Sequence, residues 1–111
     1  MAVRSAEIAS MSVTTSALTT LFTCSSGQSV IVKDVAWSQG GAVVAQRYLY
    51  VKRGSAYYPV DYVLSSATVP FHRTTPWVVL EPGDQLVHFA TLANAGAWLL
   101  RVHGAILSGV A

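Results

Sequence analysis

Apolar and polar side chains alternate along most of this chain with the two-residue period of β-strands. The pattern predicts strands at residues 18–24, 29–37, 42–53, 57–64, 77–80, 85–91 and 97–107. Clusters of Gly, Ser, Asn and Pro separate these segments, and no convincing amphipathic helix interrupts them. About seven to nine short strands spaced in this way predict an all-β fold, namely an antiparallel β-sandwich, of which a jelly roll is one form.

The strongest strand candidate changes phase in its middle. Val30 and Val32 fall on one face of a regular strand. Val35 and Trp37 fall on the opposite face. Because a β-bulge inserts one extra residue and resets the alternation, a bulge at residues 33–34 would turn all four side chains toward one core. We therefore expect a bulged strand here.

The strand at 42–53 predicts a surface that meets another protein. Tyrosines on one of its faces combine apolar rings with polar hydroxyls, a chemistry common where a surface meets a partner. Basic residues interleave with them, as they also do in single-strand nucleic-acid binders. A net charge of +2 without clustering on one face favours the protein interface. The candidate interface residues are Arg47, Tyr48, Tyr50, Tyr57, Tyr58 and Arg73.

A strand–turn–strand signal spans residues 77–86. Pro82 presets the φ angle of the second turn position, and Gly83 supplies the positive φ that a type II turn requires next. We expect Asp84 to accept hydrogen bonds from the turn amides. Glu81 and Asp84 stand on one hairpin, whereas glycosidase chemistry needs two carboxylates across a cleft. The hairpin is therefore predicted to be structural.

The first 17 residues are rich in Ser, Thr and Ala. They are expected to form an extended arm or an edge strand ahead of a sandwich domain at 18–111. A helix at 5–11 is a short alternative, and isolated helices of that length are marginal. The N-terminal segment lacks the apolar core of a signal peptide, which predicts synthesis in a cytoplasm.

Charge is scarce in this chain. Hydrophobic residues make up 52% of the sequence and charged residues 11%, with a mean hydropathy of +0.46. Ordinary soluble domains carry about a quarter charged residues. The deficit suits either a membrane protein or a subunit that hides its surface against neighbours. Gly, Pro, Ser or a charge breaks every apolar run before the about 20 residues that a membrane-spanning helix needs, which favours the assembly subunit.

Catalytic and metal-binding patterns are weak. His72, His88 and His103 lack metal-ligand spacing, so we expect histidines at the surface or an interface, with His88 and His103 as candidate cross-strand partners. The single cysteine, Cys24, is expected to be a small buried thiol. No cofactor, metal, nucleic acid or membrane partner is predicted, and we expect a protein that is not an enzyme.

Three segments resemble small virion proteins of tailed bacteriophages: the hairpin at 21–35, the strand at 48–54 and the hairpin at 77–86. The resemblance implies a β-sandwich that packs on the head or tail of the particle, commonly as an oligomer. We therefore expect a structural subunit of a phage virion, either a capsid decoration (cement) protein or a minor tail protein. Its expected partners are copies of itself, with a trimer as one form, and a major capsid or tail protein.

The alternative function is a carbohydrate- or receptor-binding module of a phage tail. Such a module would present Trp37, Trp77 or Trp98 as an exposed aromatic platform. The two hypotheses differ in what they demand of the surface. Assembly buries apolar and tyrosine-bearing strand faces, whereas sugar binding needs at least one solvent-exposed tryptophan.

Overall fold

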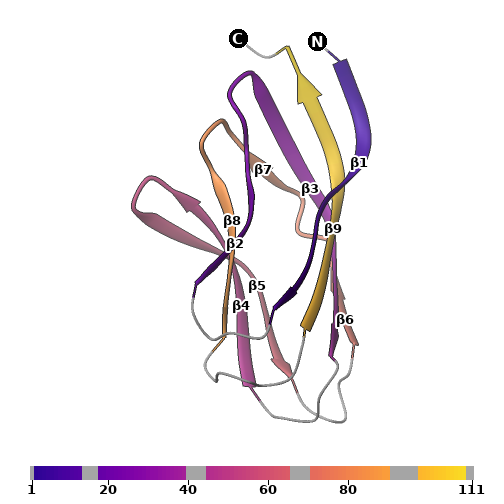
Figure 1. Ribbon diagram of the computed structural model, residues 1–111, viewed down its shortest axis with the longest axis vertical. Helices are drawn as coiled ribbons and strands as arrows, with labels where there is room; N and C mark the ends of the chain where they lie inside the picture. The colour runs from indigo at the N-terminus through magenta and orange to yellow at the C-terminus, as the bar shows by residue number, and fades with distance from the viewer. Residues whose placement is uncertain (1, 14–17, 40–44, 66–70, 91–97, 110–111) are drawn as a thin grey trace.

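The chain folds into two antiparallel β-sheets packed face to face (Figure 1), as the alternation predicts. The computed structural model describes residues 2–13, 18–39, 45–65, 71–90 and 98–109. Within these ranges it contains nine strands and no helix. The strands are β1 Ala2–Val13, β2 Thr19–Thr23, β3 Gln28–Gln39, β4 Ala45–Arg53, β5 Ala56–Ser65, β6 Phe71–Thr74, β7 Val78–Leu80, β8 Gln85–Ala90 and β9 Trp98–Ser108.

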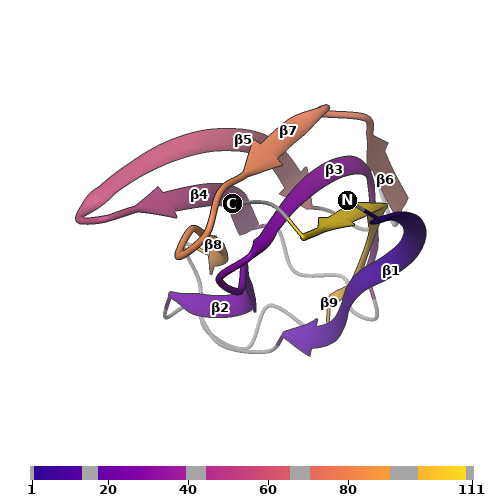
Figure 2. The same ribbon diagram turned by 90° about the horizontal axis from the view of Figure 1, so that it is seen from above.

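The chain passes back and forth between the two sheets. One sheet runs β1-β9-β3-β6, with β7 also paired to β3, and the other runs β2-β8-β4-β5. Because β6 and β7 pair with different halves of β3, they act as one interrupted strand. Counted in that way, the eight strands have the order of a jelly roll. The view from above shows the two layers and the long β4–β5 hairpin that extends beyond them (Figure 2).

The N-terminal segment is a strand and not a helix. Residues 2–13 pair with β9 along their whole length, from Ala2 opposite Ser108 to Val13 opposite Trp98. This pairing places β1 at the edge of the five-stranded sheet. The short helix considered for residues 5–11 does not form, because the strand satisfies the backbone groups against a long neighbour.

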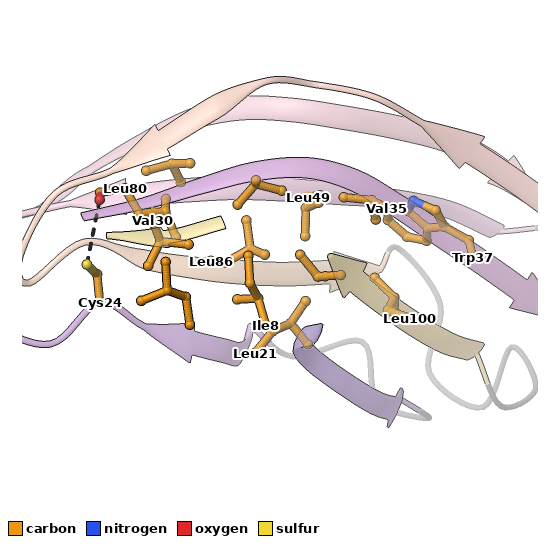
Figure 3. Close-up of a cluster of buried hydrophobic side chains, with 14 of the residues drawn as sticks. Ile8, Leu21, Cys24, Val30, Val35, Trp37, Leu49, Leu80, Leu86 and Leu100 are labelled. Atoms are coloured by element: carbon orange, nitrogen blue, oxygen red, sulfur yellow. Dashed lines mark hydrogen bonds between the residues drawn. The ribbon is translucent and has the colours of Figure 1, made fainter. Parts of the chain in front are cut away.

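The expected bulge in β3 is confirmed. The register against β9 shifts between Val32 and Asp34, so Lys33 is the extra residue. As a result Val30, Val32, Val35 and Trp37 all face the core and are 0% exposed. Figure 3 shows this core, in which Leu49 and Leu86 from the other sheet meet Val30 and Val35.

A second bulge lies at the same level on the other side of β9. The β1 register shifts between Glu7 and Ala9, and both Glu7 and Asp34 lie opposite His103. The next residue, Gly104, lies against the backbone of β3. A Cβ there would overlap the carbonyl oxygen of Ile31 and lie 2.9 Å from Ile8 Cδ1. Only glycine fits at this position without movement of the backbone.

The turn at residues 81–84 matches its predicted chemistry. Gly83 has a φ of 90°, the Asp84 amide donates to the Glu81 carbonyl at 2.9 Å, and the Asp84 carboxylate accepts from the Glu81 amide at 2.9 Å. Arg53 also donates to this carboxylate from Nε and Nη2, and that contact is the main reason why the pKa of Asp84 lies below its usual value. The turn is thus held from inside and from the β4–β5 hairpin.

Cys24 is the buried thiol that the sequence predicts. It donates weakly to the carbonyl of Leu80 at 3.6 Å (Figure 3), and burial is the main cause that raises its pKa. Its backbone exchanges hydrogen bonds with Gly83 and Asp84. This residue therefore ties the β2–β3 connection to the turn at 81–84.

Among the described residues there is no helix long and apolar enough to cross a membrane.

Candidate assembly interface

Aromatic side chains gather on the outer face of the four-stranded sheet. Tyr48 lies opposite Tyr62 of β5 on one side and Phe89 of β8 on the other. Two residues along β4, Tyr50 points the same way, because side chains two apart share a strand face. Tyr57 reaches this face from β5, opposite Lys52. We call Tyr48, Tyr50, Tyr57, Tyr62 and Phe89 the aromatic face.

The rings of the aromatic face contact one another. Tyr48 is the centre: its ring centroid lies 5.8 Å from Tyr50, 5.1 Å from Tyr62 and 6.2 Å from Phe89. Tyr57 meets Tyr50 edge-to-face at 5.9 Å. Tilted and edge-to-face pairs at these distances are favourable beyond simple burial. The face is therefore preorganised, and its rings are held before any partner arrives.

The aromatic face is hollowed beside β2 and carries little charge. Leu18, Tyr50, Tyr57 and Phe89 line a depression of about 320 Å³. Among the described residues of these four strands, Lys52 supplies the charge on this face, with its Nζ 5.6 Å from the Tyr57 ring centroid. The Tyr48 hydroxyl donates to Gln46 Oε1 at 3.3 Å. Neutral hydrogen-bonding groups and apolar rings thus dominate the surface.

Three of the six expected interface residues lie together on the aromatic face: Tyr48, Tyr50 and Tyr57. Tyr58 does not join them, because it is the next residue along β5 and alternation turns it the other way. It lies opposite Val51 and lines a groove of about 220 Å³ at the open side of the sandwich, with Pro59 and Val78. Tyr58 therefore belongs to a different surface.

Arg47 is not a surface residue, and its expected place in an interface needs correction. It is 1% exposed, because it lies on the inward face of β4 with Leu49 and Val51. Its Nη1 lies 3.4 Å from His88 Nε2. Burial lowers the pKa of Arg47 to about 10. The arginine is therefore part of a polar layer inside the sandwich.

Arg73 lies on the other sheet and is engaged within the chain. Its Nε and Nη2 donate to the two carboxylate oxygens of Asp34 at 2.7 and 3.0 Å. This two-point contact links β6 to β3 across the outer face of the five-stranded sheet. Arg73 is therefore far in the fold from the tyrosines with which the sequence groups it.

Two members of the aromatic face escape the sequence pattern. Tyr62 lies five residues after Tyr57, so a regular strand would place them on opposite faces. The β5 register shifts at Val60, and this bulge brings both rings to one side. Phe89 comes from β8, whose neighbour β4 is remote in sequence. A bulge signal near Pro59 could have identified Tyr62, whereas Phe89 requires the strand order.

The histidines do not pair as expected. His88 belongs to the four-stranded sheet and His103 to the five-stranded sheet, so they are not cross-strand partners. His88 is fully buried beside Trp37, with ring centroids 5.8 Å apart. Burial, and then the charge of Arg47, lower the pKa of His88 to about 4. The expectation of a surface histidine is wrong at this position.

The remaining polar contacts of this layer are structural in character. His72 Nε2 lies 3.2 Å from Asp61 Oδ2, and its ring meets Trp37 edge-on at 6.4 Å. In the described ranges no three His, Cys, Asp or Glu side chains come close enough to hold a metal ion. Of the tryptophans, Trp37 is buried and Trp77 is exposed, while the side chain of Trp98 lies outside the described residues.

Comparison with known proteins identifies the fold. No protein-family model matches the chain, and no curated protein sequence matches it. A solved structure of similar shape is the Drosophila NLP-core, described for its pentamer formation and histone binding; it is 13% identical, covers 96% of this chain and 97% of its own, and has a TM-score of 0.50. A second is from infectious bursal disease virus, Gt strain, with 13% identity, 95% and 32% coverage, and a TM-score of 0.49. At this identity the likeness concerns the β-sandwich fold alone.

Proposed function

We propose that this protein is a non-enzymatic structural subunit of a bacteriophage virion that associates with copies of itself through the aromatic face. The observation that carries the proposal is the continuous cluster of five aromatic rings on the outside of the four-stranded sheet. Tyrosine-rich surfaces with few charges are typical of protein interfaces. The charge deficit of the whole sequence supports the same conclusion.

The size of the aromatic face suits a stable contact. Four strands about 4.8 Å apart, with nine residues in β4 rising about 3.3 Å each, give a face of about 19 by 30 Å. This is of the same order as the about 800 Å² that each partner contributes to a standard interface. Burial of such a face would stabilise the assembly by removing apolar rings from water.

A second copy of this chain fits the face better than a charged partner does. Among its described residues the face offers rings and hydroxyls but, apart from Lys52, no charge that would select an oppositely charged surface. Another copy supplies the same rings, which can interdigitate, and the same hydroxyls, which can donate and accept. The fold is compatible with such assembly, since the NLP-core, which shares it, forms pentamers.

The virion role rests on the resemblance of three segments to phage virion proteins. Two of those segments are the β2–β3 region and the hairpin at 77–86, which the structure joins through Cys24 and the turn. The third is the strand that carries Tyr48 and Tyr50. A decoration protein or a minor tail protein would dock this assembly on a major capsid or tail protein.

Analytical ultracentrifugation tests the self-association. The informative variant is Tyr62→Lys, because Tyr62 is 46% exposed on the aromatic face and its replacement spares the core. The matched control is Leu99→Lys, since Leu99 is 39% exposed on the outer face of the other sheet. We expect an oligomer for the natural protein and for Leu99→Lys, and at least about tenfold weaker association for Tyr62→Lys. A monomeric natural protein at high concentration would contradict the proposal.

The virion role has a separate test. Quantitative mass spectrometry of purified particles should detect the protein at a fixed copy number. A number comparable with that of the major capsid protein would indicate a decoration protein, whereas a handful of copies would indicate a tail component. Absence of the protein from purified particles would refute the virion role, whatever the oligomeric state.

A further inference from the structure

A hollow on the outer face of the five-stranded sheet lies away from the aromatic face. It has a volume of about 400 Å³, and its lining residues are Ser5, Ala6, Glu7, Lys33, His103 and Gly104. β9 forms its floor, while β1 and β3 form its sides, because β9 lies between them in the sheet. Both neighbouring strands are bulged at this level, and a bulge bends the strand that carries it.

An exposed tryptophan stands at one side of this hollow. Trp77 precedes β7 and is 63% exposed, with a φ of 52°. Bulky residues rarely adopt this left-handed conformation, and such exceptions concentrate at functional sites. Lys33 Nζ lies 5.2 Å from the centroid of the Trp77 ring. Lys33 is the extra residue of the β3 bulge, so two backbone irregularities place this cation beside this ring.

The lysine has no acidic partner within the chain. All five acidic residues lie in the described ranges, and each has another partner: Glu7 with His103, Asp34 with Arg73, Asp61 with His72, Glu81 with Ser29, and Asp84 with Arg53. Lys33 therefore offers its ammonium to the indole ring and to whatever enters the hollow. A cation beside an exposed aromatic ring suits a ligand that has both a carboxylate and an apolar face.

We propose that the hollow and Trp77 form a binding site for an acidic saccharide. The indole would stack against the C–H face of a sugar ring, as amphipathic aromatics do at wet surfaces. Lys33 would pair with the sugar carboxylate, which gains from a charge-assisted hydrogen bond. Ser5, Glu7 and His103 supply donors and acceptors for the hydroxyls on the β1 side. This arrangement of convergent polar groups around a concave surface is typical of ligand sites.

The distance from Glu7 across the hollow to Trp77 is long enough for an oligosaccharide. Glu7, His103 and Lys33 come from three adjacent strands, and Trp77 lies beyond the third. Three strand spacings of about 4.8 Å give a length of about 14 Å. A single carboxylated sugar would engage the Lys33 end, while neighbouring sugars would extend toward Glu7. The site would thus recognise the acidic ring and add affinity from its neighbours.

Isothermal titration calorimetry on the full chain tests the proposal. The acidic probes are 3′-sialyllactose and tri-galacturonate, and the neutral probes are lactose and maltotriose. We expect the natural protein to bind at least one acidic probe about tenfold more tightly than its neutral counterpart. Trp77→Ala should abolish binding, and Lys33→Gln should remove the preference for the acidic sugar while weak binding of both remains.

Lys52→Gln is the matched control, because Lys52 holds the same position over Tyr57 on the opposite outer face. It should bind like the natural protein. The Tyr62→Lys variant should also keep its sugar binding, so failure of the self-association would not affect this result. If neither acidic probe binds the natural protein, or if Trp77→Ala binds as well as Lys52→Gln does, the cation and the ring serve only to hold β7 against β3, and the proposal is wrong.

Discussion

The two outer faces of this sandwich use side chains in opposite ways. The outer face of the five-stranded sheet carries charged side chains, among them the ion pair of Arg73 with Asp34 at 2.7 Å and the unpaired Lys33, beside exposed apolar side chains such as Leu99. The outer face of the four-stranded sheet presents tyrosine rings that contact one another, with Lys52 as the charge among the described residues of that face. One face therefore mixes charged groups with exposed apolar side chains, whereas the other exposes mainly aromatic rings that contact one another.

This difference arises because the few charged residues are distributed unevenly between the two outer faces. The sequence has seven Lys and Arg residues and five Asp and Glu residues. Had these been spread evenly, neither outer face would have stood out as an interface. Because they concentrate on the five-stranded sheet and in the interior, the aromatic face is left as the surface that gains most from being covered.

A glycine substitution in the five-stranded sheet should cost more folding stability than one in the four-stranded sheet. In Gly104→Ala, the new Cβ would overlap the Ile31 carbonyl, and a backbone oxygen cannot move as a flexible side chain can. We expect the free energy of unfolding to fall by about 3 kcal/mol, the upper end of what overpacking usually costs, measured by chemical denaturation.

Gly54→Ala on the β4–β5 hairpin is the control for this prediction. Gly54 has a φ of 61° with open space around its Cβ position, so the substitution costs only backbone strain. We expect a loss of about 1 kcal/mol. Equal losses in the two variants would show that the close approach at Gly104 is relieved by movement, and would remove the difference in backbone tolerance between the sheets.

Acid should destabilise the folded protein through His88, which belongs to one sheet and contacts Trp37 of the other. The pKa of His88 is about 4 in the folded protein against an ordinary 6.5. Below pH 6.5 the unfolded chain binds a proton that the folded chain does not accept until about pH 4. Stability should therefore be fully present above pH 6.5 and fall by about 3 kcal/mol as the pH drops to about 4.

Denaturation curves at several pH values measure this loss. His88→Gln should remove most of the dependence between pH 6.5 and 4, whereas His103→Gln on the outer surface should keep it. The lowered pKa of Asp84 acts mainly below the ordinary carboxyl value of 3.8, so it contributes little between pH 6.5 and 4. An unchanged pH dependence in His88→Gln would show that another group controls the acid response.

The sequence predicted much of this fold because strand alternation and turn residues act over a few neighbouring positions. The phase change at Val32 and Val35 required an extra residue, and the structure places it at Lys33. The turn at Pro82 and Gly83 depends on two neighbouring φ angles, which the residue types fix. The seven strands predicted from alternation match β2–β5 and β7–β9 to within a few residues, whereas the short β6 was not among them.

The candidate interface was harder to predict because it depends on the strand order. Tyr48 and Phe89 are adjacent only because β8 lies beside β4. Alternation along β4 places Arg47 on the face of Leu49 and Val51, but a charged side chain was expected at a surface, and only the strand order brings His88 to within 3.4 Å of it. Arg73 was grouped with the tyrosines although it lies on the other sheet, because sheet membership leaves no period in the sequence.

Salt should distinguish which outer face mediates association. An interface made of neutral rings is insensitive to screening, whereas one made of ion pairs weakens as the Debye length shortens. Between about 0.1 and about 1 M salt we expect the association constant to change by less than about twofold. Sedimentation equilibrium measures it. A large loss of affinity with salt would indicate that the charged face is the interface, which would reverse the comparison.

The smallest effect is expected from Arg73→Gln. The guanidinium makes two hydrogen bonds to Asp34, yet its side chain is 62% exposed, and water and salt replace most of what such a surface pair contributes. The thermal unfolding midpoint and the oligomeric state should both stay as they are in the natural protein. Calorimetry and ultracentrifugation on one sample check both. If Arg73→Gln dissociates the oligomer while Tyr62→Lys does not, then the paired charges form the interface and the aromatic face is only a stable surface of the monomer.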